Sequence, residues 1–265
     1  MLGAMFGDIV GSVYEFHNIK TKEFPLFCPK SKITDDSVMT VAVADALMQF
    51  ENAIENTENF KEVLIDKMHE YGRRYPNSGY GGHFRVWLAL EKRQPYNSFG
   101  NGSAMRVSPV AWYAKTLDEA LELAKATAEV THNHSEGIKG AVVTAGAAFL
   151  ARTGHGKDEI ADFVKRYYDI DFTVDGIRPT YRFDVTCQGS VPQAIVCFLD
   201  SESFEDAIRN CISIGGDCDT TAAICGAVAQ GYYGMTDEQK AKVFERIDER
   251  MSLTVADFCK KYINA

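Results

Sequence analysis

Two long segments of this chain consist almost entirely of small and apolar residues, and they constrain the fold more than any other feature. Residues 135–151 read SEGIKGAVVTAGAAFLA, and residues 219–234 read DTTAAICGAVAQGYYG. Alanine has the highest helix propensity, and a helix that is apolar all round is buried. Residues 35–50 (DDSVMTVAVADALMQF) are nearly as apolar. We therefore predict three buried helices that pack closely, because small side chains let helix backbones approach one another.

The rest of the pattern is typical of surface helices rather than strands. Amphipathic spacing predicts helices over 58–74, 117–129 and 158–168. Strand signals are scarce: 171–187 alternates weakly, and a turn at Asp175-Gly176 makes it compatible with a small hairpin. No Pro/Gly/Ser-rich linker divides the 265 residues, a length that one domain can have. The prediction is an all-α fold, compact and single-domain, over residues 1–265.

The charge balance excludes two classes of partner. The chain has 37 acidic and 28 basic residues and a formal net charge of -9, whereas nucleic acids and anionic membranes attract basic surfaces. No uncharged apolar run is long enough to span a membrane, and the N-terminus lacks the basic start of a signal peptide. The seven cysteines show no CxxC or zinc-type spacing, so we expect reduced thiols and a cytoplasmic protein. These features leave the oligomeric state open.

Acids stand together at the start of two of the predicted buried helices. Thr34-Asp35-Asp36 opens one, and Asp217-Cys218-Asp219-Thr220 opens another. Both are also ordinary helix caps, because hydroxyls and carboxylates satisfy free N–H groups there. The alternative is a cation site, since these oxygens suit Mg²⁺ or Mn²⁺ rather than zinc. Asp217 and Asp219 can converge only where the backbone is not helical, and Gly215-Gly216 permits such a backbone.

The N-terminal segment adds one more acid and a packing signal. Residues 3–16 (GAMFGDIVGSVYEF) predict a helix on which Asp8 and Glu15, seven residues apart, share a face. Taken alone, Glu15 is most simply a solvated surface acid. Glycines recur at every fourth position, at Gly3, Gly7 and Gly11. This spacing predicts a helix face that packs closely on a neighbouring helix.

Two glycine-rich segments, 78–82 (SGYGG) and 100–106 (GNGSAMR), precede helical stretches. Glycine N–H groups before a helix can cradle phosphate, but neither segment follows a strand as in known nucleotide-binding motifs. Ordinary turns explain them equally well. His132 and His134 lie in a polar turn with no third metal ligand nearby, and Arg106 is expected to be structural, bonding nearby carbonyls or carboxylates.

In this order, these segments resemble the ADP-ribosylglycohydrolase family, which includes the dinitrogenase-reductase-activating glycohydrolase and the eukaryotic ADP-ribosyl-acceptor hydrolases. The resemblance extends to about residue 235 and includes GSVPQA at 189–194. It implies an all-α fold with two Mg²⁺ ions, or Mn²⁺, at the bottom of an ADP-ribose cleft. It also implies the metal ligands Thr34, Asp35, Asp36, Asp217, Asp219 and Thr220.

The resemblance implies further roles. Glu15 matches an acid near the metals, and we expect Glu15, Asp36 and Asp217 to be catalytic. The expected substrate-binding residues match segments that line the ribose and pyrophosphate in the family. They are Gly79, Tyr80, Gly81, Asn101, Gly102, Ser103 and His132. One departure is visible: Cys218 stands where the family usually has Ser or Thr. A thiol there predicts sensitivity to oxidation or to soft metals.

The implied activity is Mg²⁺-dependent hydrolysis of the bond between ADP-ribose and a modified protein side chain or a small conjugate. Four aspartates in one pocket need cations to ionise together, and carboxylates stabilise the oxocarbenium-like transition state. ADP-ribosyl-arginine is the default substrate, with serine or O-acetyl-ADP-ribose as alternatives. Two other classes are a non-catalytic ADP-ribose-binding or structural relative, against which the intact acids argue, and a metal-dependent pyrophosphohydrolase.

Overall fold

Helices account for the regular secondary structure in residues 1–50 and 52–263, the part of the chain that the computed structural model describes. They are α1 (Leu2–Gly11), α2 (Asp35–Gln49), α3 (Thr57–Arg74), α4 (Gly82–Ala89), α5 (Gly102–Met105), α6 (Ser108–Tyr113), α7 (Leu117–Glu129), α8 (Ser135–Arg152), α9 (Lys157–Val164), α10 (Val174–Ile177), α11 (Cys187–Leu199), α12 (Phe204–Ile214), α13 (Cys218–Tyr233), α14 (Asp237–Phe244), α15 (Glu249–Phe258) and the π-helix η1 (Cys259–Ile263). Strand-like pairing among these residues is limited to one isolated bridge between Gly100 and Thr186. The all-α prediction is confirmed.

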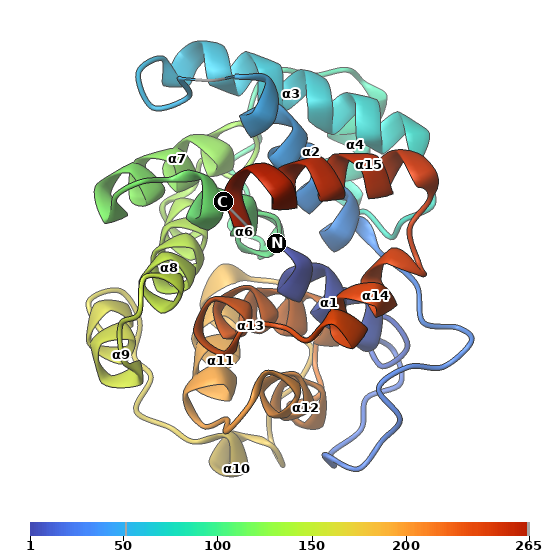
Figure 1. The fold of residues 1–265 in the computed structure, drawn as a ribbon, viewed down its shortest axis with the longest axis vertical. Coiled ribbons are helices and arrows are strands. Elements are labelled where there is room, and N and C mark those ends of the chain that lie inside the picture. Colours follow the sequence, from blue (N-terminus) through green and yellow to red (C-terminus); the bar gives the residue numbers. More distant parts are fainter. Residues whose placement is uncertain (51, 264–265) are drawn as a thin grey trace.

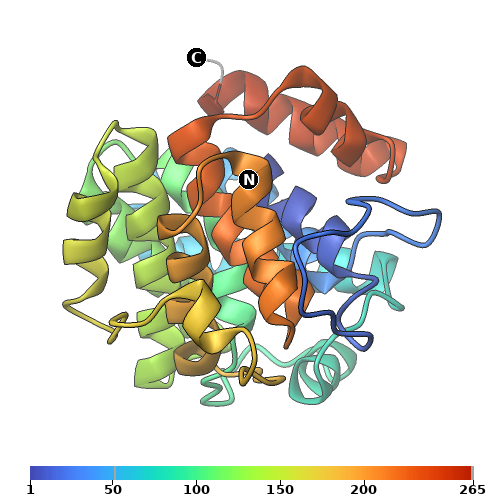
Figure 2. The same ribbon diagram turned by 90° about the horizontal axis from the view of Figure 1, so that it is seen from below.

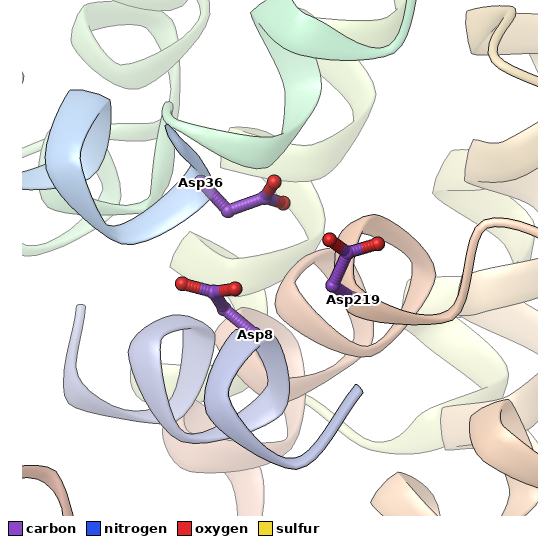
Figure 3. Close-up of side chains that lie close together, drawn as sticks. All are labelled: Asp8, Asp36 and Asp219. Atoms are coloured by element: carbon purple, nitrogen blue, oxygen red, sulfur yellow. The ribbon is translucent and has the colours of Figure 1, made fainter. Parts of the chain in front are cut away.

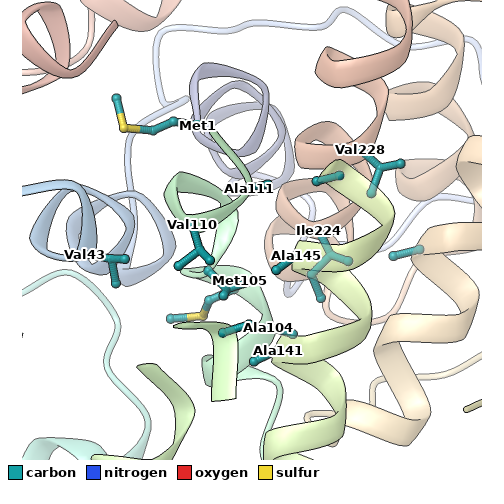
Figure 4. Packing of buried hydrophobic residues seen from close by; sticks show 14 of the residues in the cluster. Met1, Val43, Ala104, Met105, Val110, Ala111, Ala141, Ala145, Ile224 and Val228 are labelled. Atoms are coloured by element: carbon teal, nitrogen blue, oxygen red, sulfur yellow. The ribbon is translucent and has the colours of Figure 1, made fainter. Parts of the chain in front are cut away.

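The central element is α13, which contacts α1, α8, α11 and α12 (Figure 1). Every residue of α13 from Cys218 to Gln230 is buried, as its composition predicts. Small side chains permit this burial: Ala145 of α8 and Ile224 of α13 lie in the continuous core where these two helices meet (Figure 4). On the other side of the core α2 packs against α3 and α15.

The predicted glycine face of α1 determines how closely α1 approaches α13. A Cβ added at Gly3 would lie 2.1 Å from the carbonyl oxygen of Gly226, and one at Gly7 would lie 2.1 Å from that of Ala222. At Gly11 it would lie 2.4 Å from the Cα of Asp219. Such distances are impossible for a real Cβ, so the glycines allow α1 to pack closely along α13.

Two predictions of local structure are wrong. The stretch 171–187 forms no hairpin: Thr173 caps α10 by accepting a hydrogen bond from Gly176 N–H, and the bridge partner of Thr186 is the distant Gly100. The first helix ends at Gly11 rather than near residue 16, so Asp8 and Glu15 do not share a helix face. Residues 12–34 instead form a long irregular segment on the outside of the molecule (Figure 2).

None of the helices that the structure describes combines the length and the apolar character that a membrane crossing requires.

Candidate metal centre and ligand cleft

Three helices meet at a cluster of buried acids. Asp36 lies in the first turn of α2, Asp219 lies in the first turn of α13, and α1 brings Asp8. Figure 3 shows the three carboxylates pointing toward one another. One oxygen from each lies within 4.8 Å of an oxygen from the other two. The positive ends of the two longer helices favour negative charge at this point.

Asp8 is the acid of this cluster that the sequence reasoning did not assign. It is fully buried, and its carboxylate accepts hydrogen bonds from the N–H of Thr34 (3.0 Å) and of Ser37 (3.1 Å) and from both of their hydroxyls. Asp8 therefore holds the start of α2 in place. Its flanking glycines indicated packing rather than chemistry, and its spacing from Glu15 was the one hint of a role.

A second group of acids shares Asp219 with the first. Glu15, Asp217 and Asp219 each offer an oxygen within 4.8 Å of the others. Gly215 and Gly216 have φ angles of 71° and 80°, a region that favours glycine. The backbone before α13 is thus not helical, as the glycine pair predicts, and this lets Asp217 turn toward Asp219.

Asn18 ties the segment that carries Glu15 to the turn that carries Asp217. Its side-chain amide donates to the carbonyl oxygens of Tyr14 (2.7 Å), Glu15 (2.9 Å) and Gly216 (3.0 Å). In return, Gly216 N–H donates to Asn18 Oδ1 at 2.7 Å. A segment without regular structure is thereby attached to the cluster.

Burial and mutual repulsion hold protons on these carboxyls. Burial, with the Asp219 carboxylate adding to it, raises the pKa of Glu15 to about 8 and those of Asp35 and Asp36 well above their usual range. Burial also raises the pKa of Asp217 to about 6. Without cations, the cluster therefore remains partly protonated at neutral pH.

The donor set fits divalent cations of the Mg²⁺ type. All the converging atoms are carboxylate or hydroxyl oxygens, the ligands that such hard cations prefer. Asp36 Oδ1 is buried and has no hydrogen-bond partner within the described ranges, while Oδ2 accepts from the Thr220 hydroxyl at 3.3 Å. A buried oxygen without a partner is costly, and a cation would satisfy it. Two groups that share Asp219 are compatible with two ions.

A cleft of about 380 Å³ lies against the acids, within the range of small-molecule sites. Its wall includes most of the predicted site residues: Glu15, Asp35, Asp36, Gly79, Gly81, Asn101, Gly102, His132, Asp217, Asp219 and Thr220.

Three predicted site residues are not among the residues that line the cleft. The Thr34 hydroxyl donates to Asp8 Oδ1 at 2.7 Å, although its lone pairs remain near Asp36. Tyr80 is buried, with its ring against Phe84. Ser103 is fully buried, and its hydroxyl donates to the carbonyl oxygen of Gly137. Neither the Tyr80 nor the Ser103 side chain lines the cleft, and their roles in substrate binding stay predictions.

Asn101 lines the cleft, but its side chain belongs to the acid cluster. The amide donates to Asp217 Oδ2 at 2.7 Å and to Ser190 Oγ at 3.0 Å. This contact between residues 116 apart in the sequence orients Asp217, a role that the local sequence pattern did not indicate.

An aromatic pair at the cleft was also missed. Phe16 and Phe183 line it, their rings lie 6.2 Å apart and nearly parallel, and their exposed fractions are 77% and 48%. Exposed aromatic rings beside a cleft suit contact with a bound molecule. No periodicity marks either residue, because both lie on irregular segments.

The ADP-ribosylglycohydrolase family model matches residues 1–255, and the chain belongs to this family. Mouse ADP-ribosylhydrolase ARH3 is 27% identical, over 94% of this chain and 88% of its own length. The ADP-ribosyl-[dinitrogen reductase] glycohydrolase of Rhodospirillum rubrum is 25% identical, over 89% and 85%. The chain is therefore an ADP-ribosylglycohydrolase, an enzyme that hydrolyses the glycosidic bond of ADP-ribose conjugates.

Two further relatives bear on substrate and fold. The ADP-ribosylarginine hydrolase Tri1 of Pseudomonas putida is 24% identical, over 89% of this chain and 70% of its own length. A solved structure of an ADP-ribosylglycohydrolase-related protein complex superposes with a TM-score of 0.67 at 20% identity, covering 97% of this chain and 95% of that one. This superposition shows that the two chains share a fold.

Proposed function

We propose that this protein is a Mg²⁺-dependent hydrolase that releases ADP-ribose from modified protein side chains, with ADP-ribosyl-arginine as its default substrate. The observation that carries the proposal is the convergence of Glu15, Asp217 and Asp219 with Asp8 and Asp36 at one end of a cleft. The name of the Pseudomonas relative supports arginine as the acceptor.

Six residues would hold two divalent cations: Thr34, Asp35, Asp36, Asp217, Asp219 and Thr220. When bound, such cations neutralise the carboxylates, orient ribose hydroxyls and lower the pKa of water. Asp8 and Asn101 keep this ligand set in position through their hydrogen bonds to Thr34 and Asp217.

The carboxylates of the chain act on the reacting bond in two ways. Cleavage at the anomeric carbon builds positive charge on the ribose ring, and Asp36 and Asp217 offer negative charge beside it. Glu15 lies on the same wall and moves a proton, either from the attacking water or to the departing acceptor group. Burial raises the pKa of Glu15 to about 8 in the metal-free site, and bound cations would lower it again, which favours proton exchange by this group.

The rest of the cleft orients the two ends of the substrate. The glycines at 79, 81, 100 and 102 leave backbone groups open to the cleft, which suits a pyrophosphate. Phe16 adjoins Glu15, so the aromatic pair lies on the side where the acceptor departs. A guanidinium is planar and cationic and packs well on such rings, which also favours arginine.

The test is release of ADP-ribose from arginine-modified and serine-modified peptides, with Mg²⁺ and with EDTA. We expect metal-dependent release of intact ADP-ribose, faster from the arginine peptide. Asp45→Asn, which changes a part-buried acid of α2 outside the cleft, is the control and should retain activity. AMP with ribose phosphate would identify a pyrophosphohydrolase instead. Binding of ADP-ribose without turnover would identify a non-catalytic relative, and preference for serine would overturn the arginine assignment.

A further inference from the structure

The cleft wall also contains a buried guanidinium without a matching carboxylate. Arg106 is 1% exposed and lines the cleft. Its Nη2 donates to the carbonyl oxygen of Thr127 (3.0 Å) and to Thr131 Oγ1 (2.8 Å). Within residues 1–50 and 52–263 it has no ion-pair partner, and its Nε has no hydrogen-bond partner. Buried charges are normally paired, and an anionic ligand in the cleft would supply the matching charge.

The donor and acceptor roles around Arg106 are determined by its chemistry. A guanidinium can only donate hydrogen bonds, so Thr131 Oγ1 must accept from it. Thr131 Oγ1 also lies 2.7 Å from His132 Nδ1. If the Thr131 hydroxyl donates there, Nδ1 is an acceptor and the ring proton is on Nε2. If instead Nδ1 carried the proton, the fully buried Thr131 hydroxyl would be left without an acceptor in the described part of the chain.

The other ring nitrogen of His132 faces the cleft beside the second glycine loop. A Cβ added at Gly102 would lie 3.1 Å from Nε2, and one at Gly100 would lie 3.6 Å from it. Nε2 makes no hydrogen bond to the residues that the structure describes. Burial and the charge of Arg106 lower the pKa of His132 well below its usual value, so the ring remains neutral and keeps a single N–H.

We propose that Arg106 and Thr131 are positioning residues that fix His132 as a neutral donor through Nε2–H to a phosphate oxygen of the ligand. The contact with a phosphate oxygen rests on the proposed function, since an ADP-ribose conjugate supplies the pyrophosphate. The assignment of the His132 tautomer does not depend on the proposed function. His132 then binds and orients the substrate and takes no part in proton transfer. The buried charge of Arg106 offsets one charge of the pyrophosphate without an exposed lysine or arginine.

The first test reads the tautomer directly. Two-bond proton–nitrogen NMR correlations of ¹⁵N-labelled protein distinguish a protonated from an unprotonated ring nitrogen, and His132→Gln identifies the signals of His132. We expect the Nε2–H form in the unmodified protein, which needs no variant to fold. Arg106→Met leaves the Thr131 oxygen free to accept, so the Nδ1–H form should appear. An Nδ1–H ring in the unmodified protein would overturn the proposal.

The second test separates positioning from general stability. Thr131→Val removes the hydroxyl that links Arg106 to His132. It should weaken ADP-ribose binding about tenfold, as expected for a hydrogen bond to a charged group. The change should appear in KM and in the calorimetric Kd, with or without EDTA, and kcat should change by less than about twofold. Thr131→Ser keeps the hydroxyl and should restore binding. Thr144→Val is the matched control, because Thr144 is buried in α8 and its hydroxyl has no partner within the described residues.

The outcomes distinguish the two proposals. If Thr131→Val folds with an unchanged melting temperature and binds ADP-ribose as tightly as the unmodified protein, the positioning role is overturned. If the unmodified protein shows the Nε2–H ring but binds no ADP-ribose at all, the proposed function fails, and the phosphate contact fails with it.

Discussion

Two groups of side chains at the cleft differ in the sign of the charge that the protein leaves unmatched. In the acid cluster, Asp8, Asp36 and Asp219 converge, and no lysine or arginine forms an ion pair with them in the described residues. In the group formed by Arg106, Thr131 and His132, the guanidinium is buried without a carboxylate. The first group is complementary to cations and the second to an anion. An acidic protein can thus present a buried positive charge to the anionic ligand that we propose.

The two groups also differ in how the backbone builds them. The acid cluster is held by the starts of α2 and α13 and by the glycine face of α1. The His132 ring lies in a turn against Gly100 and Gly102, and Asn101 between these glycines joins this part of the wall to Asp217. We expect substitutions in the acid cluster to abolish turnover and those around His132 to weaken binding.

The largest effect is expected from removing negative charge from the acid cluster. Asp217→Asn with Asp219→Asn keeps the shape of both side chains but removes two cation ligands. Hydrolysis should fall by about 10³-fold or more, as expected when metal-assisted catalysis is lost. The affinity for ADP-ribose should fall much less, because Arg106, Thr131 and His132 are unchanged. The measurement is single-turnover release of ADP-ribose beside calorimetric binding. Retention of more than a tenth of the activity would show that the acids do not carry the reaction.

Glu15→Gln should have the next largest effect. It removes the proton-transfer group while the Asn18 hydrogen bonds to the backbone remain, so kcat should fall about 10²-fold. The Kd for ADP-ribose should remain within a few-fold. Steady-state kinetics over a range of Mg²⁺ concentrations would separate this loss from weaker metal binding, and Glu23→Gln, an exposed acid of the same segment, is the control. An equal loss of kcat in both variants would contradict a proton-transfer role for Glu15.

Metal removal should destabilise the protein more at high pH than at low pH. In the metal-free protein the folded pKa values of Asp217 and Glu15 are raised to about 6 and about 8. The folded state therefore holds more protons than the unfolded state, and stability falls as pH rises from about 4 to about 8. Mg²⁺ replaces those protons. The rise in melting temperature on adding Mg²⁺ should thus be larger at pH 8 than at pH 6, and a larger rise at pH 6 would contradict it.

The sequence predicted the helices well and the site partly, for physical reasons. The helix predicted at 35–50 is α2 (Asp35–Gln49), because its apolar periodicity arises locally. The approach of Asp217 to Asp219 followed from the Gly215-Gly216 pair. The roles of Asp8 and Asn101 depend on contacts between distant segments, which no local pattern encodes. The hairpin at 171–187 failed because Asp175-Gly176 suits a capped helical turn as well as a hairpin turn.

Beside His132, Gly102→Ala should weaken binding without abolishing turnover. The new Cβ would lie 3.1 Å from His132 Nε2, and overpacking costs roughly 1–3 kcal/mol, so the Kd for ADP-ribose should rise about tenfold. The Mg²⁺ dependence of the remaining activity should not change. Gly82→Ala is the matched control, since Gly82 also lines the cleft but a Cβ there meets no atom within 4 Å. Equal effects of the two variants would argue against a tight fit of the ligand between Gly102 and His132.

The smallest effect is expected at Cys218, although it lies between two acids of the cluster. Its Sγ is fully buried, donates to the carbonyl oxygen of Gly216 (3.5 Å) and is not part of the cleft wall. Burial raises the pKa of this thiol well above its usual range, which disfavours the reactive thiolate and opposes the expected sensitivity to oxidation. Cys218→Ser should keep activity within about twofold, because a hydroxyl can make the same hydrogen bond.

The part-buried Cys28, whose pKa is lowered chiefly by its backbone hydrogen bond to Lys30, should react with iodoacetamide before Cys218 does. Mass spectrometry of the labelled peptides beside residual activity would check this order, and inactivation that Cys218→Ser prevents would contradict it.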